Sequence, residues 1–187
     1  MLIVLIILAI VALDQFTKFL VVSSMVEHQT TGFIKGFMEL TYKKNTGVAF
    51  GLLSEQRWLF MTFTAIMLVV MIAFLIKYRK SNIVLRISVA FLTGGGIGNM
   101  IDRLFRVDID GSKFVVDFFE FSFVDFAIFN VADCFVTFGA ILLAVYVLFI
   151  DHKDPIFVTE KPAVAIGDEQ SEDDEIETED GSSGDDE

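Results

Sequence analysis

Two aspartates in this chain of 187 residues could perform chemistry together. Asp117 lies among apolar residues in the segment VVDFF, and Asp133 lies three residues after Asn130, at the predicted start of an apolar helix. Two carboxylates that come close together in a poorly hydrated site cannot both ionise easily and tend to share a proton. One can then act as a base on a water molecule while the other donates a proton to the carbonyl oxygen of the bond under attack. The pair therefore indicates hydrolysis assisted by two acids.

Each aspartate also has a structural interpretation. Asn130 and Asp133 fit a helix start, with the asparagine as N-cap and the carboxylate at the N3 position, where it would only satisfy backbone N–H groups. Asp117 could be an interfacial charge turned to water. Taken together, the two acids favour the chemical interpretation, because they come from different elements and can approach each other.

Other catalytic groups are scarce. The chain has two histidines, His28 and His152, and one cysteine, Cys134, which has no basic partner beside it. A nucleophilic Ser–His or Cys–His pair is therefore not expected. The same composition disfavours a metal site and a disulfide scaffold, so we expect neither a metal nor another cofactor.

The elements that must position these groups are predicted to be membrane-spanning helices. Hydrophobic residues make up 54 % of the chain, which is too much for an ordinary soluble domain. A transmembrane helix needs about 20 mostly apolar residues. Four segments meet this requirement: residues 2–22, 58–76, 83–101 and 131–150. We therefore expect a mainly α membrane protein with four transmembrane helices.

The charge divides the chain into two predicted domains. Residues 168–187 contain twelve Asp or Glu and no Lys or Arg, and the remaining 14 acids balance 14 bases. We expect a catalytic membrane domain over residues 1–153 and a disordered acidic cytoplasmic tail over residues 154–187. Because the chain has no excess of basic residues, nucleic-acid binding is excluded.

Basic residues in a short turn set the predicted orientation. The turn between the second and third segments carries four bases and no acid: Lys77, Arg79, Lys80 and Arg86. This places the turn and both chain ends in the cytoplasm, so residues 24–57 and 102–130 face outward. The first outer loop is rich in Phe, Thr, Tyr and Val, which predicts short strands. The seven phenylalanines of residues 114–129 predict a loop that dips into the membrane interface.

Polar residues of the predicted spans converge at one depth. Asp14 and Lys18 are four residues apart on one helix face, where they can pair. The other polar groups lie at the outer ends of the third and fourth segments: Asn99, Asp102, Arg103, Asn130 and Asp133. Polar side chains inside a membrane are costly, so their convergence indicates a functional site in the outer leaflet.

Single members of this set also have simpler explanations. Asp14 and Lys18 could be only a neutralising pair that holds helices together. The glycines at positions 94, 95, 96 and 98 could allow close helix contact. The segment Asn45-Thr46-Gly47 is typical of a turn.

Five blocks of the sequence resemble the lipoprotein signal peptidases (signal peptidase II), a family of bacterial membrane aspartic peptidases. They are DQFTK (residues 14–18), NTGVAFG (45–51), GGGIGNMIDR (94–103), VVDF (115–118) and FNVADCFVTFG (129–139). They occur in the family's order, and the resemblance covers about residues 1–150. It implies a catalytic dyad of Asp117 and Asp133. It also implies supporting or substrate-binding roles for eight residues: Asp14, Lys18, Asn45, Asn99, Asp102, Arg103, Asn130 and Ala132.

The resemblance further implies a substrate and a fold. The substrate would be a pro-lipoprotein whose cysteine carries diacylglycerol, cleaved N-terminal to that cysteine at the outer face of the cytoplasmic membrane. The fold would be a four-span bundle in membrane lipid, N-in and C-in, with a small extracytoplasmic β-sheet and a surface helix. We expect Asp133, at a helix N-terminus, to ionise more readily, and Asp117 to hold the shared proton longer.

Two other functions are compatible with parts of this pattern. A transporter or proton-relay subunit could use Asp14, Lys18 and Asp133 as relay groups, but the inner halves of the spans lack the polar steps that a relay needs. Another kind of intramembrane aspartyl protease would carry both acids on transmembrane helices, whereas Asp117 is predicted to lie in a loop.

Overall fold

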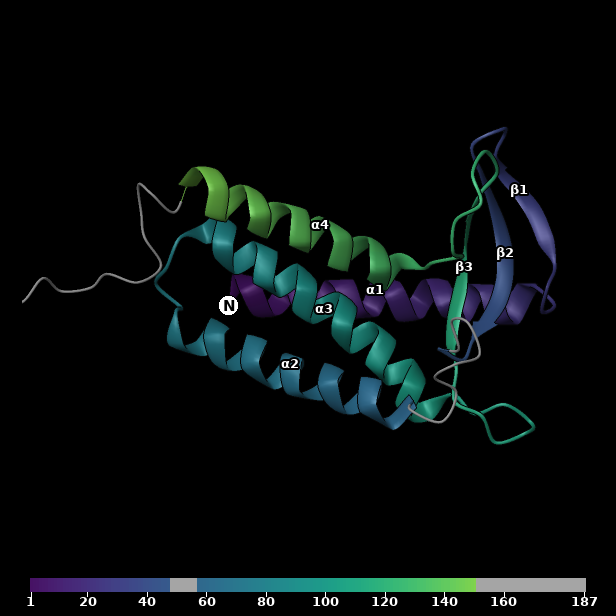
Figure 1. Cartoon of the computed structure of the whole chain (residues 1–187), viewed down its shortest axis with the longest axis horizontal. Coiled ribbons are helices and arrows are strands. Elements are labelled where there is room, and N and C mark those ends of the chain that lie inside the picture. Colours follow the sequence, from purple (N-terminus) through teal and green to yellow (C-terminus); the bar gives the residue numbers. More distant parts are fainter. Residues whose placement is uncertain (48–56, 151–187) are drawn as a thin grey trace, which may run out of the picture. The chain divides into compact units, whose positions relative to one another are not determined.

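Four helices and three strands make up the described part of the chain (Figure 1). The structure is a computed structural model that describes residues 1–47 and 57–150. The second half of the predicted NTGVAFG block, from position 48, and the predicted acidic tail at 154–187 lie outside the described residues.

The helices confirm the four predicted apolar segments. They are α1 (Leu2–Ser24), α2 (Arg57–Lys77), α3 (Ile83–Phe105) and α4 (Val131–Val145), the last continued by the π-helical turn η2 (Tyr146–Ile150). Among the described helices, α1, α3 and α4 with η2 are long and apolar enough to cross a membrane. The apolar stretch found in α2, Met61–Lys77, is shorter. The chain is therefore a membrane protein with three to four apolar helices.

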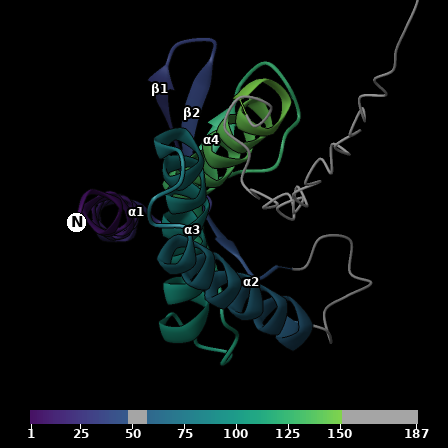
Figure 2. The same cartoon turned by 90° about the vertical axis from the view of Figure 1, so that its left-hand side faces the viewer.

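Helix α3 lies between the other three helices, as the end-on view shows (Figure 2). Its glycines face different neighbours. A Cβ atom at Gly94 would lie 3.0 Å from Ile10 of α1, and one at Gly96 would lie 3.0 Å from Leu68 of α2. A Cβ atom at Gly95 would collide with the backbone of Ala132 in α4. The glycines thus allow the close helix contacts that the sequence indicated.

The strands form one antiparallel sheet in the order β1 (Thr30–Ile34), β2 (Met38–Asn45) and β3 (Val115–Phe121). The first two confirm the strands predicted in the outer loop. One face of the sheet packs on α1, where Val21 contacts a cluster that contains Tyr42, Val116 and Phe118. The segments 25–47 and 106–130 contain no further helix, so the implied surface helix is not found in these parts of the chain.

The prediction that Asp117 lies in a loop is wrong, because it lies on β3 opposite Lys43 of β2. Residues 115–118 are all buried. A strand covered on both faces reads as a continuous apolar run and lacks the alternation that marks a half-buried strand. Only residues 122–129, beyond β3, form the loop that the phenylalanines predicted.

Candidate active site

The predicted pair on α1 is confirmed, and it belongs to a larger buried ionic cluster. The side chains of Asp14, Lys18 and Asp102 are 0 % exposed. Lys18 Nζ lies 2.9 Å from Asp14 Oδ2 and 3.0 Å from Asp102 Oδ2. The Lys18 ammonium donates a further hydrogen bond to Asn99 Oδ1, at 2.9 Å. Lys18 therefore neutralises Asp14 and ties α1 to α3, as the helix-holding interpretation predicted, and its contact with Asn99 goes beyond that interpretation.

The two carboxylates of the cluster extend this junction to the remaining elements. The backbone N–H of Ala132, in the first turn of α4, donates to Asp14 Oδ1 at 3.0 Å. The backbone N–H of Val116 on β3 donates to Asp102 Oδ2 at 3.1 Å. Gly98 of α3 makes room for the Asp14 carboxylate, because a Cβ atom at that position would lie only 2.5 Å from Asp14 Oδ2. The ionic cluster thus joins α1, α3, α4 and β3 at one position along the bundle.

Two members of this cluster were not identified from the sequence. Gln15 Nε2 donates to Asp14 Oδ2 at 3.1 Å and to Asp102 Oδ1 at 3.2 Å, and Arg106 Nε donates to Asp102 Oδ1 at 2.8 Å. The four-residue spacing between Asp102 and Arg106 is a signal that could have revealed the second. Burial of the carboxylates is the reason for so many donors, since a buried charge is costly unless its hydrogen bonds are satisfied.

Asn99 connects the ionic cluster to Asp133. Its Oδ1 accepts hydrogen bonds from Lys18 Nζ and from Asn130 Nδ2, the latter at 3.0 Å. Because an ammonium group can only donate, the carbonyl end of the Asn99 amide must face Lys18. The amide nitrogen then points the other way and donates to Asp133 Oδ1 at 2.8 Å.

The capping interpretation of Asp133 is confirmed, and it leaves room for a second role. Asn130 Oδ1 accepts from the Asp133 backbone N–H, and Asp133 Oδ2 accepts from the Asn130 backbone N–H, both at 3.1 Å, which completes a capping box. Only Oδ2 is used by the cap, whereas Oδ1 receives the Asn99 amide. Both oxygens of the half-buried Asp133 carboxylate thus accept a hydrogen bond.

Asp117 is not a charge turned to water, because its side chain is buried in the structure. The residue is 2 % exposed, and both of its oxygens accept amide hydrogen bonds. Asn130 Nδ2 donates to Oδ1 at 2.6 Å, and Asn45 Nδ2 donates to Oδ2 at 2.7 Å. One residue, Asn130, therefore contacts both Asp117 and Asp133.

The pKa of Asp117 is raised to about 6 from 3.8. Burial is the main cause, because it penalises the charged form. The nearby Asp133 carboxylate raises the pKa further, while the hydrogen bonds from Asn45 and Asn130 lower it. Two carboxyl groups in such an environment are suited to share one proton.

Asn45 forms the predicted turn with its side-chain oxygen and contacts the carboxyl group of Asp117 with its side-chain nitrogen. Its Oδ1 accepts from the Gly47 backbone N–H at 2.8 Å, and Gly47 has a φ of +76°, which favours glycine. The turn interpretation is therefore confirmed. Because the turn uses only the side-chain oxygen, the amide nitrogen is available for Asp117.

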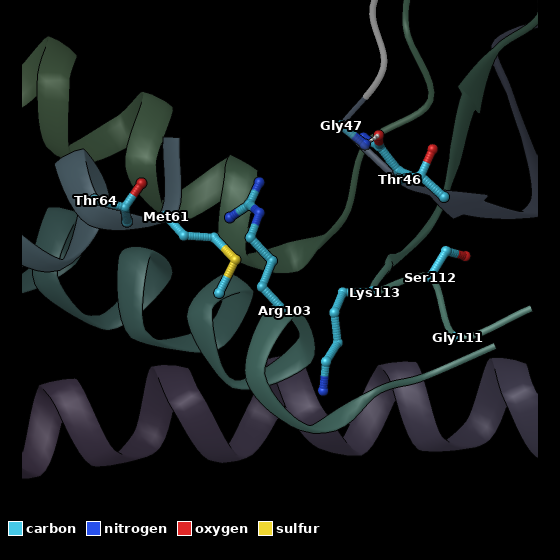
Figure 3. A pocket seen from close by; sticks show the side chains of 9 residues that line it. Thr46, Gly47, Met61, Thr64, Arg103, Gly111, Ser112 and Lys113 are labelled. Carbon is cyan, nitrogen blue, oxygen red and sulfur yellow. Dashed lines mark hydrogen bonds between the residues drawn. The ribbon is translucent and has the colours of Figure 1, made fainter. Parts of the chain in front are cut away.

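Arg103 lies apart from this hydrogen-bond network. It lines a cavity of about 310 Å³, and no hydrogen bond joins it to another described residue. Figure 3 shows Arg103 between Met61 and Lys113, with its guanidinium pointing away from α1. Asn45 lines the same cavity and thereby connects it to Asp117. The cavity is a place where a chain segment could approach the carboxylates.

A surface ion-pair cluster beside Asn45 was also missed in the sequence. Lys44 Nζ lies 2.8 and 2.9 Å from the two oxygens of Asp108 and 3.1 Å from Glu27 Oε2. These pairs raise the pKa of Lys44 and lower the pKa of Asp108. They link β2 to the segment between α3 and β3. Their partners are distant in sequence, so spacing gives no signal for them.

The described residues therefore define a membrane protein whose buried polar groups converge on two carboxylates at one end of a helical bundle. All ten predicted site residues except Arg103 join one hydrogen-bond network. Within residues 1–47 and 57–150, no group of three or more His, Cys, Asp or Glu side chains is arranged to hold a metal ion.

Comparison with known proteins identifies the family. A family model described as "Signal peptidase (SPase) II" matches residues 6–149. The lipoprotein signal peptidases of Streptococcus pyogenes serotype M5 (strain Manfredo) and serotype M18 (strain MGAS8232) are each 41 % identical to this chain over 142 residues. The matched part covers 76 % of this chain and 90 % of each relative. The chain belongs to the signal peptidase II family, a family of peptidases.

Solved structures agree with this assignment. A bacterial membrane enzyme determined by the in meso method at 2.3 Å resolution has a TM-score of 0.68 and 32 % sequence identity, covering 83 % of this chain and 93 % of that one. A second such structure, at 1.9 Å resolution, has a TM-score of 0.66 and 32 % identity, covering 79 % of this chain and 93 % of that one.

Proposed function

We propose that the protein is an aspartic endopeptidase that removes the signal peptide from pro-lipoproteins. The substrate is a precursor whose cysteine carries diacylglycerol, and the cleaved bond lies on the N-terminal side of that cysteine. One observation carries the proposal: Asn130 contacts Asp117 and Asp133 together, in a largely buried polar site at one end of an apolar bundle. The relatives named lipoprotein signal peptidases support the substrate class.

In the proposed mechanism the two carboxyl groups share one proton. Asp133 takes a proton from water, the resulting hydroxide adds to the amide carbonyl carbon, and Asp117 donates its proton to the carbonyl oxygen. When the tetrahedral intermediate collapses, the C–N bond breaks and a proton passes to the amino group of the cysteine. A pKa of about 6 for Asp117 supports its role as the proton donor. The products are the signal-peptide carboxylate and the free amine.

The other predicted site residues have positioning or binding roles in this proposal. Asn99 and Asn130 hold the two carboxyl groups, and Lys18 holds Asn99. Arg103, which lines the cavity beside Asn45, is available to bind the peptide backbone of the substrate. Asp14, Asp102 and the Ala132 N–H hold the helices in place. The apolar helix surfaces would receive the acyl chains.

The proposed topology has four spans. Helix α2 is 21 residues long, which suffices to cross about 30 Å. The basic turn between α2 and α3 supports a cytoplasmic position for that end of the bundle. The opposite end, with the sheet and the two carboxylates, then faces the extracytoplasmic side of the cell membrane. Both termini, including residues 154–187, lie inside.

The test uses the full chain in lipid nanodiscs, with a diacylglyceryl-modified precursor and without an ion gradient. The wild-type protein should cleave the precursor, which a transporter or proton-relay subunit would not do. Asp117→Asn and Asp133→Asn should each lower the rate by a factor of at least about 100. Asp125→Asn is the matched control, because Asp125 is an exposed acid shortly after β3. Cleavage retained in both dyad variants would overturn the assignment of the dyad, and no cleavage by the wild type would overturn the function.

A further inference from the structure

An apolar groove, which we call the seam groove, runs along the contact between α3 and α4. The two helices lie side by side in both views of the structure (Figures 1 and 2). The groove has a volume of about 430 Å³ and is lined by Leu92, Ala140, Leu143, Ala144, Val147 and Leu148. These six lining residues are all apolar, so the groove offers its surface to an apolar partner.

The seam groove lies on the same side of both helices as the candidate active site. Asn99 of α3 donates to Asp133 of α4 at 2.8 Å, at the sheet end of the seam. Leu92 lies seven residues before Asn99, and Ala140 lies seven residues after Asp133. Because seven residues are almost two complete helical turns, each pair faces the same side of its helix. The groove therefore continues the line of the site, beginning about 10 Å farther from the sheet.

Small residues let another helix come close to α4 at this groove. Ala140 and Ala144 are one helical turn apart and are both exposed. Behind them α4 packs tightly on α3, because a Cβ atom at Gly139 would lie 2.9 Å from the backbone nitrogen of Leu92. Small side chains on an apolar helix allow the backbone of a partner helix to approach closely. The shape of the seam groove thus fits an apolar helix.

The length of the groove matches the apolar core of a signal peptide. The groove extends from Ala140 to Leu148, which lie seven and fifteen residues after Asp133. Its far end is therefore about 22 Å along the helix from that residue. The apolar core of a signal peptide has about 7–15 residues. A helix of that size that ends at the two carboxylates would cover the whole groove.

The proposed topology also fixes the direction of such a helix. Helix α4 begins beside the carboxylates and leads away from the sheet, towards the end that carries the basic turn. A precursor that is cut at the sheet end has its apolar core between that end and the opposite, cytoplasmic end. Its helix must therefore run antiparallel to α4.

We propose that the seam groove binds the apolar helix of the signal peptide, N-terminal to the cleaved bond and antiparallel to α4. This inference rests on the proposed function, because the cleaved bond holds one end of that helix at Asp117 and Asp133. The residue about 7 positions before the bond then lies at Ala140, and the residue about 11 positions before it lies at Ala144. The acyl chains of the substrate lie on other apolar helix surfaces.

Disulfide crosslinking tests both the position and the direction of the helix. Cys134 is the only cysteine, so Cys134→Ser gives a background without cysteine, and Asp117→Asn keeps the precursor uncleaved. To this background we add Ala140→Cys or Ala144→Cys. The precursor carries one free cysteine, about 7 or about 11 residues before the bond. Ile141→Cys is the matched control, since Ile141 follows Ala140 directly but is 56 % exposed on another face of α4.

In nanodiscs, oxidation should link position 140 to the nearer precursor cysteine and position 144 to the farther one. The exchanged pairs should form several-fold less product, and position 141 should link to neither cysteine. Crosslinking at position 141 as strong as at position 140, or none at either groove position, would overturn the proposal. Links between two copies of the chain at position 144, without links to the precursor, would mean a dimer interface and would also overturn it.

A blocking variant measures what the groove contributes to cleavage. Ala144→Phe should fill the groove and lower kcat/KM for the complete precursor by about tenfold. Thermal unfolding should change little, because Ala144 is exposed. Ile141→Phe is the control and should leave both quantities unchanged.

A shortened substrate separates the signal peptide from the acyl chains. A diacylglyceryl-modified peptide with about three residues before the cleaved bond reaches at most about 11 Å, which is too short to meet Ala144. Ala144→Phe should therefore cleave this peptide as fast as the wild type does. Slower cleavage of the short peptide would show that an acyl chain occupies the groove, and an unchanged rate on the complete precursor would show that nothing does. Either result would overturn the proposal.

The outcome for the groove can be told apart from the outcome for the proposed function. A wild-type protein that cleaves the precursor, combined with absent groove crosslinks, would overturn the groove assignment alone. A wild-type protein that cleaves no precursor would overturn the proposed function and the groove assignment with it.

Discussion

Lys18 donates a hydrogen bond to Asn99 Oδ1 at 2.9 Å, and this contact determines which end of the Asn99 amide faces Asp133. The ammonium is fully buried and is held by Asp14 and Asp102, so it cannot turn away. An asparagine amide is nearly symmetric in shape, and only its hydrogen-bond partners fix its orientation. A residue of α1 therefore orients a donor on a carboxylate of α4 that it does not touch.

Removing the Lys18 charge should lower the rate of the proposed cleavage. In Lys18→Met the Asn99 amide loses the donor that fixes it, so we expect kcat to fall by about 10- to 100-fold with a smaller change in KM. The variant should also unfold more easily, because two buried carboxylates lose their cation. Steady-state kinetics and thermal unfolding in the same detergent measure the two effects.

Two further variants separate positioning from stability. Gln15→Leu removes hydrogen bonds from the same carboxylates without touching Asn99, so it should lower stability and leave kcat nearly unchanged. Asn99→Ala keeps the buried ion pairs and should lower kcat as Lys18→Met does. A folded Asn99→Ala protein with normal kcat would disprove the positioning role.

The pH dependence of the cleavage should reveal the proton on Asp117. Because the proposed donor has a pKa of about 6, kcat/KM of the free enzyme should fall as the pH rises above that value. The Asn45 amide stabilises the charged form of Asp117, so Asn45→Ala should raise the pKa of Asp117 further. The limb of the pH profile on which kcat/KM falls should then move to higher pH by up to about one unit. Thr46→Ala, in the same turn, should not move it. A limb that stays in place in Asn45→Ala would show that another group titrates.

Replacing Asp117 should stabilise the fold at neutral pH. Its pKa is about 6 in the folded protein, against 3.8 for an aspartate in an unfolded chain, so the folded state binds more protons between these values. Stability therefore falls as the pH rises through this window, and the ionised carboxylate lowers the free energy of unfolding by about 3 kcal/mol above it. Asp117→Asn should have a higher melting temperature than the wild type at pH ~7.5. The difference should shrink or reverse below pH ~4, where Asp117 is protonated in both states.

Adding one methyl group to α3 should have opposite outcomes at two glycines. Gly98→Ala places Cβ 2.5 Å from Asp14 Oδ2, so the buried carboxylate must move and the junction of α1, α3 and α4 should open. We expect a loss of about 2–4 kcal/mol in unfolding free energy, together with loss of cleavage. Gly96→Ala meets only the end of the Leu68 side chain, at 3.0 Å, which can shift. Equal melting temperatures for the two variants would contradict this account.

The extent of the helices and the helix start at Asn130 could be predicted from the sequence. Hydropathy over about 20 residues identifies an apolar helix, and the Asn130–Asp133 spacing identifies a capping box, because both depend on neighbouring residues alone. The pairing of Asp14 with Lys18 was predictable for the same reason, since one helix turn separates them. These features are local, and the surrounding fold does not change them.

The environment of Asp117 could not be predicted in this way. The sequence allowed Asp117, between Val116 and Phe118, to be a charged residue in a loop with its carboxylate in water. In the structure, pairing of β3 with β2 and packing of the sheet against α1 bury the residue. The donors on its two oxygens, Asn45 and Asn130, are 72 and 13 residues away in the chain. The direction of the Asn99 amide likewise depends on Lys18, 81 residues away. Residue types and spacing thus identify the groups that meet, but only packing decides which oxygen faces which donor and how much water remains.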